Sequence, residues 1–238
     1  MESRYCPICK TVAAAFLPFG RRSRTNAQCP RCRSLERHRL VWLFFERCTS
    51  LFTAIPKTFL HWAPEPCLFA GLKTVSNLAY VSADIVPNRA IVTMSITHIC
   101  YPSEYFDYVY CSHVLEHIGE DRLAMRETAR VLKAGGSAIF MVPLRSSPTY
   151  ENRSIVTPEG RAKAFGQHDR VRSYGPDFGG RLAETGLRVK CIRPDAIAGE
   201  KEMRAMALRS DEHIFVGHKF QRIRNKTAER ERGYRDQH

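Results

Sequence analysis

The sequence predicts an α/β fold built on a parallel sheet, with a small module in front of it. Residues 106–143 hold two apolar, β-rich runs, 106–112 and 137–142. They flank a polar segment, 121–132, that has helical apolar spacing and is expected to end at a Gly-Gly stop. A strand, a helix and a second strand in this order form the crossover unit of a parallel sheet. The 238 residues, 44% hydrophobic and 26% charged, suffice for one core and a short extension.

Four cysteines near the N-terminus predict a metal site. Cys6 and Cys9 form one CxxC pair, Cys29 and Cys32 form a second, and 19 residues separate the pairs. Two residues between cysteines let one tight turn direct both thiolates at a single ion, and this spacing is typical of tetrahedral Zn²⁺. We therefore expect a structural zinc ribbon over residues 1–33 whose metal drives its folding. Four unliganded thiols are the alternative.

A connecting helix is expected over residues 34–50. Ser34 is a suitable N-cap, and the following residues carry an apolar stripe, with Arg37, His38 and Arg39 on another face. Two interpretations of the arginines stay open. They either belong to a helix that packs the ribbon onto the main domain, or they reach over an active site toward an anionic substrate.

The main domain is expected over residues 51–220. Alternating or continuous apolar runs predict further strands before and after the opening unit, and a helix precedes the last two strands. The expected strands are 58–62, 80–83, 90–93, 187–192 and 213–220, and the expected helix is 176–185.

The motifs of this domain resemble those of class I S-adenosylmethionine (SAM) methyltransferases of the type 11 kind. The residues that carry the resemblance are FD before a strand, HVLEHI after it, and RVLKAGG, where Ala134 replaces the usual proline. CPRCRSLERHR resembles the opening of a group in which a zinc ribbon precedes the catalytic domain. The resemblance implies a Rossmann-like seven-stranded sheet with an antiparallel last strand, and SAM as cofactor.

The cofactor site is expected beyond the carboxyl ends of the strands, where open α/β sheets bind ligands. Asp84 lies 19 positions after Glu65 and suits the ribose hydroxyls, although it could simply cap a strand. The loop after the first strand has no GxG turn, but Ala63-Pro64-Glu65 resembles the loop of the same zinc-ribbon group, so we expect a substitution for the usual loop. The resemblance places Glu65 against the ammonium of SAM. Ser95 stands where the family commonly has an adenine-reading aspartate. The expected cofactor residues are His61, Ala63, Glu65, Asp84, Ser95, Ser112 and His113.

His113 is the first candidate for a catalytic residue, because it directly follows the fourth strand. His117 lies four residues on, and Glu116 could orient either ring, or both could merely start a helix. A general base is useful only where the acceptor must lose a proton. The pattern HxxEH also occurs in zinc proteases, but Gly119 follows too soon for a long rigid helix.

Residues 165–175 resemble a segment of the same methyltransferase group that lies over the pocket. His168, Arg172 and Tyr174 are candidates there, while Arg170 replaces the group's histidine. A guanidinium beside a phenol suits a carboxylate or phosphate on the acceptor, which predicts a small anionic acceptor methylated on oxygen or nitrogen. Alternatively, this loop only closes the edge of the sheet.

The net charge of +13 is concentrated at the ends of the chain. Residues 1–50 hold ten Lys or Arg against three Asp or Glu, and residues 219–238 hold seven against three. Residues 221–238 are expected to form a basic flexible tail. Basic ends can attract nucleic acid, so an RNA methyltransferase stays open, as does an inactive SAM-fold scaffold. The sequence shows neither a membrane span nor a secretory signal, which favours the cytoplasm, and it leaves the oligomeric state open.

Overall fold

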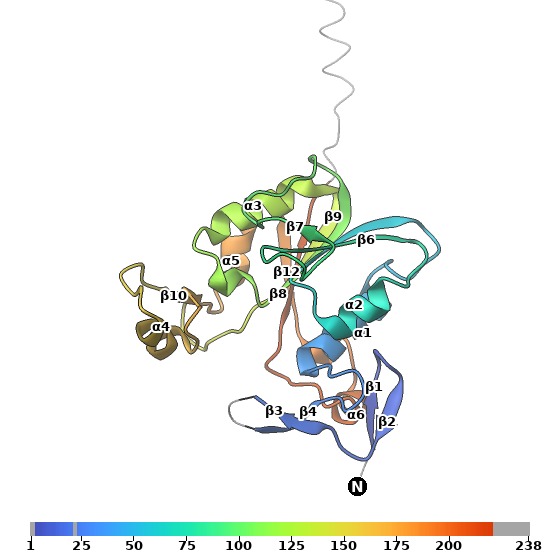
Figure 1. The fold of residues 1–238 in the computed structure, drawn as a ribbon. Helices are drawn as coiled ribbons and strands as arrows, with labels where there is room; N and C mark the ends of the chain where they lie inside the picture. The colour runs from blue at the N-terminus through green and yellow to red at the C-terminus, as the bar shows by residue number, and fades with distance from the viewer. Residues whose placement is uncertain (1–2, 21–22, 221–238) are drawn as a thin grey trace, which may run out of the picture.

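The computed structural model describes residues 3–20 and 23–220, and a seven-stranded sheet forms its centre (Figure 1). The strand order is β12-β13-β9-β8-β5-β6-β7, and only β13 runs antiparallel to the others. The predicted Rossmann-like sheet with its antiparallel last strand is confirmed. Its strands are β5 (Lys57–Trp62), β6 (Leu78–Asp84), β7 (Val92–Thr93), β8 (Phe106–Ser112), β9 (Leu132–Met141), β12 (Arg188–Ile192) and β13 (Ile214–His218).

Helices cover both faces of the sheet (Figure 1). On one face, α3 (Asp121–Val131) and α5 (Phe178–Ala183) bury Met125 and Phe178 in a core with Val109 of β8. On the other face lie α1 (Glu36–Cys48), α2 (Pro66–Leu72) and α6 (Glu200–Ala205), beside the short turn η2 (Pro194–Ala196). None of the helices within the described residues is long and apolar enough to cross a membrane.

The glycine pair after α3 does not end that helix, contrary to the sequence-based interpretation. Leu132 adopts an extended conformation and closes the helix, and β9 begins at that residue. Gly136 lies inside the strand, where a Cβ atom would come within 2.9 Å of the Asp107 carbonyl oxygen. The glycine is therefore required by close strand pairing, at a register shift between β8 and β9.

The N-terminal module consists of two short hairpins that pack against α1. Its strands are β1 (Arg4–Cys6), β2 (Thr11–Ala13), β3 (Leu17–Phe19) and β4 (Arg24–Gln28). Arg39 of α1 is fully buried and donates to the carbonyl oxygens of Ala27 at 3.1 Å, Met206 at 2.7 Å and Ala207 at 3.1 Å. The sequence places Arg39 on a face away from the apolar stripe, which is wrong, and of the two open interpretations the one in which Arg39 reaches toward a substrate does not hold. Its guanidinium joins the module, α1 and the end of α6, which supports the packing interpretation of this helix.

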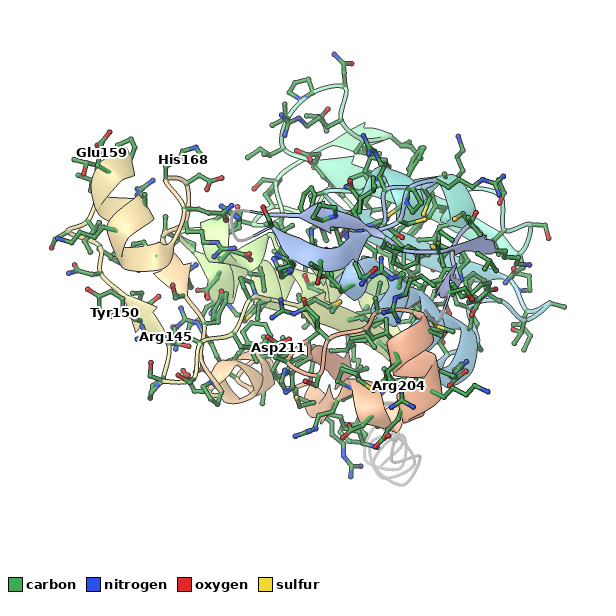
Figure 2. The ribbon with its side chains drawn as sticks, turned by 90° about the horizontal axis from the view of Figure 1, so that it is seen from below. Arg145, Tyr150, Glu159, His168, Arg204 and Asp211 are labelled. Atoms are coloured by element: carbon green, nitrogen blue, oxygen red, sulfur yellow. The ribbon has the colours of Figure 1, made fainter. Side chains whose placement is uncertain are left out.

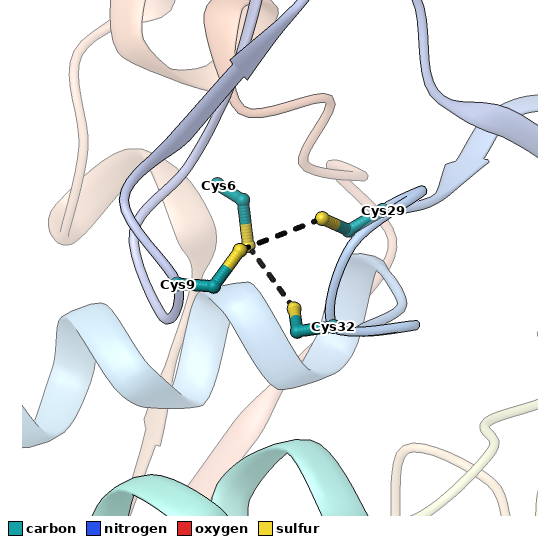
Figure 3. Close-up of side chains that lie close together, drawn as sticks. All are labelled: Cys6, Cys9, Cys29 and Cys32. Atoms are coloured by element: carbon teal, nitrogen blue, oxygen red, sulfur yellow. Dashed lines mark hydrogen bonds between the residues drawn. The ribbon is translucent and has the colours of Figure 1, made fainter.

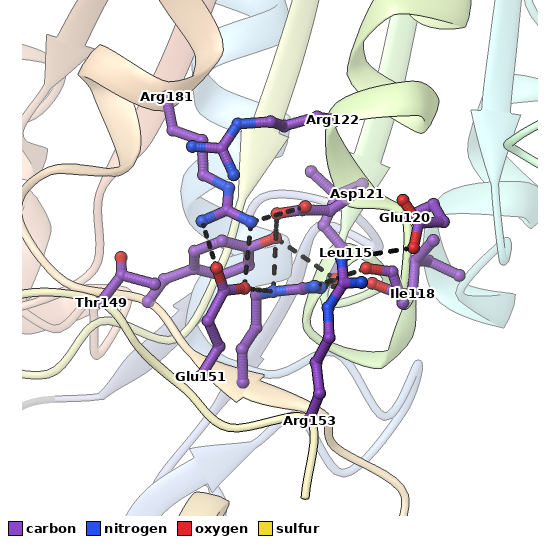
Figure 4. A network of polar contacts seen from close by, with 12 residues as sticks. Leu115, Ile118, Glu120, Asp121, Arg122, Thr149, Glu151, Arg153 and Arg181 are labelled. Atoms are coloured by element: carbon purple, nitrogen blue, oxygen red, sulfur yellow. Dashed lines mark hydrogen bonds and ion pairs between the residues drawn. The ribbon is translucent and has the colours of Figure 1, made fainter.

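An arm projects from the body between β9 and α5 (Figures 1 and 2). It contains α4 (Pro158–Phe165) and a two-stranded ribbon of β10 (Tyr150–Glu151) and β11 (Arg172–Ser173). Glu151 anchors the arm, because its carboxylate lies 3.0 Å from Arg172 Nε and 3.1 Å from Arg181 on α5 (Figure 4).

Candidate functional site

A cavity of ≈ 430 Å³ opens at the carboxyl ends of β5, β6 and β8. The strand order reverses between β5 and β8, and ligands of open α/β sheets bind at such a switch point. The volume lies within the usual range for small-molecule sites. The lining residues are Trp62, Ala63, Asp84, Ile85, Val86, Arg89, Met94, Ser95, Ile96, His113, Val114, His117, Ile118 and Asp169.

Two residues of the cavity hold the left-handed backbone conformation that favours glycine. Ala63, directly after β5, has φ 46°, and His113, directly after β8, has φ 54°. The loop after β5 therefore keeps a glycine-type backbone although it has no glycine. Such strain in a non-glycine residue costs about 1–2 kcal/mol and concentrates at functional sites.

We expect Ala63→Gly to raise the free energy of unfolding by about 0.5–1 kcal/mol, because relief of strain exceeds the added chain entropy. Urea denaturation of the two proteins measures the difference. Ala162→Gly, within α4, is the matched control and should lower stability by about 1 kcal/mol. A loss of stability in Ala63→Gly similar to that of the control would show that the loop is unstrained.

Asp84 is available for a ligand, as the ribose prediction requires. Its Oδ1 accepts the Val86 N–H at 2.8 Å, while Oδ2 has no hydrogen bond within the described residues. Ser95 also lines the cavity, but its hydroxyl lies 2.8 Å from the Thr97 hydroxyl. Asp84 thus presents a carboxylate to the cavity, whereas Ser95 already shares its hydroxyl.

Glu65 follows the strained loop and is held by His61. His61 Nε2 lies 2.8 Å from Glu65 Oε2, and His61 Nδ1 lies 2.8 Å from the Tyr80 hydroxyl. Burial would raise the pKa of Glu65, but the His61 hydrogen bond and nearby positive charge lower it to about 2. His61 is itself fully buried, so the prediction that it contacts the cofactor is corrected: it positions Glu65.

Several buried polar atoms near the strand ends lack a protein partner. Trp62 Nε1, Tyr110 Oη, Ser112 Oγ and His113 Nε2 are all buried without a hydrogen bond. An unsatisfied buried polar group costs about 1–3 kcal/mol, and native structures leave few of them. Because four of them belong to the ends of β5 and β8, a polar ligand at this edge fits the residues present.

His113 and His117 gather around a buried carboxylate. Glu116 is fully buried, and its Oε1 lies 3.4 Å from His113 Nδ1, 3.9 Å from His117 Nε2 and 3.7 Å from Arg170. Burial would raise the pKa of Glu116, but the two histidines lower it, with His113 contributing most. His117 Nδ1 also lies 3.3 Å from a carboxylate oxygen of Asp169, in the arm. The arrangement directs Nδ1 of His113 at Glu116.

The arm residues predicted to bind the acceptor lie elsewhere. Arg172 is 3% exposed and donates to the backbone carbonyls of Leu115, Ile118 and Gly119, and Tyr174 is fully buried with its hydroxyl 2.6 Å from Asp121 (Figure 4). Both side chains are therefore used inside the protein, and the expectation that they hold an anionic acceptor is wrong. His168 is exposed on the arm and does not line the cavity (Figure 2).

The HxxEH pattern lacks the geometry of a zinc protease. His113 follows a strand, and the next residues form a single 3₁₀ turn, η1 (Leu115–His117), instead of a helix. The imidazoles of His113 and His117 therefore do not lie on one face of a helix, as the zinc site of such a protease requires.

The four N-terminal cysteines do come together (Figure 3). Their Sγ atoms all lie within 4.8 Å of one another, with Cys6 and Cys32 at 3.5 Å and Cys9 and Cys29 at 3.7 Å. Four thiolates bound at 2.3 Å around one Zn²⁺ would be about 3.8 Å apart. This cluster, the one metal-ligating group found in residues 3–20 and 23–220, is therefore compatible with a zinc ribbon.

Sequence reasoning overlooked Trp62, Tyr110, Arg170 and Asp169 as contributors to this region. Trp62 and Tyr110 lie in apolar strands and give no local signal of an unpartnered polar atom. Arg170 and Asp169 belong to a polar loop, whose contact with Glu116 and His117 depends on how the arm folds back.

A larger cavity of ≈ 740 Å³ lies between α5 and the strands β12 and β13. Its lining includes Val189, Cys191 and Phe215 and none of the predicted site residues. We therefore place the candidate site in the smaller cavity, at the switch point of the sheet.

A sheet of this order, with its cavity at the carboxyl ends of the central strands, defines a Rossmann-like nucleotide-binding α/β protein. Residues 67–140 match the model of the methyltransferase domain family. The described sheet has the class I methyltransferase fold, which solved SAM-dependent methyltransferases share. No curated protein matches it.

Solved structures support the fold. The YcgJ protein of Bacillus subtilis is 13% identical to this chain, with a TM-score of 0.52. The match covers 78% of this chain and 100% of YcgJ. A SAM-dependent methyltransferase of Archaeoglobus fulgidus is 14% identical, with a TM-score of 0.53, and the match covers 79% of this chain and 96% of that protein. The [4+2]-cyclase SpnF is 14% identical, with a TM-score of 0.54, and the match covers 76% of this chain and 81% of SpnF.

Proposed function

We propose that this protein transfers a methyl group from SAM to an oxygen or nitrogen atom of a small acceptor. The observation that carries the proposal is the convergence of Asp84, His113 and Trp62 on one cavity at the switch point, with Trp62 Nε1 and His113 Nε2 buried and unpartnered. Burial of Arg172 and Tyr174 removes the earlier argument that the acceptor is anionic.

SAM supplies an activated methyl group on a sulfonium, so the protein mainly has to align and desolvate the reactants. Asp84 would hold the ribose hydroxyls through its free Oδ2. Glu116 faces Nδ1 of His113 and leaves Nε2 without a protein partner. Nε2 of His113 would then accept the proton that an alcohol or protonated amine loses on methylation. His113 is therefore the proposed general base, and Glu116 its positioning residue.

Zinc is proposed for the four-cysteine cluster, in a structural role. The convergence of all four Sγ atoms within 4.8 Å supports the proposal. With four protein thiolates the coordination shell is complete, so no position is left for a substrate.

Asp84→Asn provides the test of the cofactor site. Calorimetry should show S-adenosylhomocysteine binding to the wild type, and binding about 10- to 100-fold weaker to Asp84→Asn, because a charged hydrogen bond to the ribose is lost. Asp195→Asn, an exposed aspartate paired with Arg193, should bind like the wild type. Absence of any binding to the wild type at millimolar ligand would overturn the proposal.

The alternatives have less support. Two basic residues of the N-terminal region are used internally: Arg24 pairs with Glu36 at 3.0 Å and Arg39 is buried, which leaves less charge for RNA. The basic tail proposed for residues 221–238 lies outside the described residues. An inactive scaffold or a different reaction is the remaining rival, since the cyclase among the structural neighbours has the same fold. An assay of methyl transfer from SAM to candidate alcohols and amines distinguishes the proposed function from these alternatives. The proposed function predicts transfer by the wild type and none by His113→Gln.

A further inference from the structure

Arg37, in the first turn of α1, is half-buried and has no anionic partner. Its Nε is buried without a hydrogen bond, and no described carboxylate lies within ion-pair distance of its side chain. Its neighbours differ: Glu36 binds Arg24, and Arg39 donates to four backbone carbonyls. Partial burial of a guanidinium without a counter-charge costs free energy, and a bound anion would offset that cost.

The first turn of α1 is fixed against the loop that follows β5. His38, the next residue, lies 3.6 Å from Glu65 Oε1 through Nε2 and 3.3 Å from Cys67 Sγ through Nδ1. Burial lowers the pKa of His38 to about 3, so it is neutral and its contact with Glu65 is no ion pair. Farther along, α1 and α2 pack so closely that a Cβ atom on Gly71 would lie 2.7 Å from the Trp42 ring. Figure 1 shows α1 and α2 side by side, and the contact of His38 with Glu65 fixes the first turn of α1, which carries Arg37, against the start of α2.

The charge of Arg37 acts on Glu65 and on Tyr110 of β8. This positive charge helps lower the pKa of Glu65, and it opposes the rise in the pKa of Tyr110 that burial causes. Tyr110 Oη is one of the unpartnered atoms at the end of that strand, and His38 Nε2 is another that faces the same region. A cation, a carboxylate and unpartnered polar atoms thus lie in one region. This region adjoins the cavity through the loop that carries Ala63 and Glu65, and Ala63 lines the cavity.

We infer that Arg37 and Glu65 together bind the amino-acid end of the cofactor, Arg37 taking its carboxylate and Glu65 its ammonium. This inference rests on the proposed use of SAM. The amino-acid end is a zwitterion, so a cation and an anion in one region that are not paired with each other match it. A guanidinium binds a carboxylate with two parallel hydrogen bonds. The helix that leads from the cysteine cluster therefore supplies a residue that selects nucleotides bearing an amino acid.

The test compares two nucleotides by calorimetry. S-Adenosylhomocysteine carries the amino-acid end, and 5′-methylthioadenosine has the same adenosine and thioether without it. In Arg37→Gln the affinity for S-adenosylhomocysteine should fall about 10- to 100-fold, while that for methylthioadenosine should change less than about 3-fold. Arg47→Gln, at the other end of the same helix, is the matched control and should bind both nucleotides like the wild type.

The outcomes separate the inference from the proposed function. An equal loss for both nucleotides, or no loss for either, would overturn the role of Arg37 while leaving the cofactor site intact. Retained methylthioadenosine binding shows that the variant is folded, and Arg37→Lys should keep part of the S-adenosylhomocysteine affinity, because it keeps the charge. A wild-type protein that binds neither nucleotide would overturn the proposed function and this inference together.

Discussion

Cys29→Ser is expected to lose its zinc ion and to unfold the N-terminal module. Replacing one of four thiolates opens the coordination shell, and structural Zn²⁺ contributes about 10–16 kcal/mol of binding energy in small zinc modules. The module has little else to hold it, since its own core consists of Cys6, Phe16 and Cys29 and a few half-buried neighbours. Metal analysis should find about one zinc ion per chain in the wild type and almost none in the variant.

Hydrogen exchange locates the effect. Amides of β1 to β4 should lose protection in Cys29→Ser, whereas those of β5 and β8 should keep it, because the sheet has its own core. Cys191→Ser, which removes an exposed thiol on β12, is the control and should retain its zinc. A wild-type protein that purifies without zinc, even when metal is supplied, would contradict the ribbon.

Asp121→Ala is expected to destabilise the main domain by about 3–5 kcal/mol, because it leaves buried arginines without their counter-charge. Asp121 is 2% exposed, and its two carboxylate oxygens lie 2.7 Å from Arg181 and 2.6 Å from the Tyr174 hydroxyl, with Arg172 at 3.6 Å (Figure 4). Glu151 also contacts both arginines, but it is half-exposed and cannot replace the buried charge. Urea denaturation followed by circular dichroism measures the loss.

The control for this network is an exposed pair. Glu184→Ala removes the partner of Arg122 at the surface and should cost less than about 1 kcal/mol. Tyr174→Phe should cost about 1 kcal/mol for the lost hydrogen bond and should leave nucleotide affinity unchanged. A weakened affinity in Tyr174→Phe would show that the arm network acts on the site, and a stable Asp121→Ala would show that Glu151 suffices.

The network explains why a motif match misplaced two site residues. Arg172 and Tyr174 were assigned to the acceptor because the surrounding letters match a pocket-covering segment. Their identity was visible in the sequence, but the direction of a side chain depends on its partners, and these come from η1, α3 and β10. Arg39 was misjudged for the same reason, since its carbonyl acceptors at Met206 and Ala207 are far away in the chain.

In the loop after β5, by contrast, the structure keeps a feature that the sequence lacks. The sequence lacks the expected glycines after β5, yet Ala63 adopts the left-handed conformation that they would supply. Tertiary packing can impose a backbone that the local residue disfavours, provided that the surrounding contacts offset the strain. The prediction that this loop is a substitution for the usual one is thus consistent with its backbone, although its ligand contacts stay a prediction.

The sequence by itself determined the order and type of the main elements, because apolar spacing and strand–helix–strand patterning are local properties of the chain. It also determined the four cysteines as one group, because two CxxC pairs at that distance have few other uses. Only the tertiary structure decided which polar side chains reach the cavity. Asp84, Glu116 and His113 meet there through strand order and the folding back of the arm, whereas Arg172 and Tyr174 satisfy buried partners. The spacing of apolar residues predicts which face of a helix or strand a residue occupies. It does not predict which residues of a distant segment pack against that face.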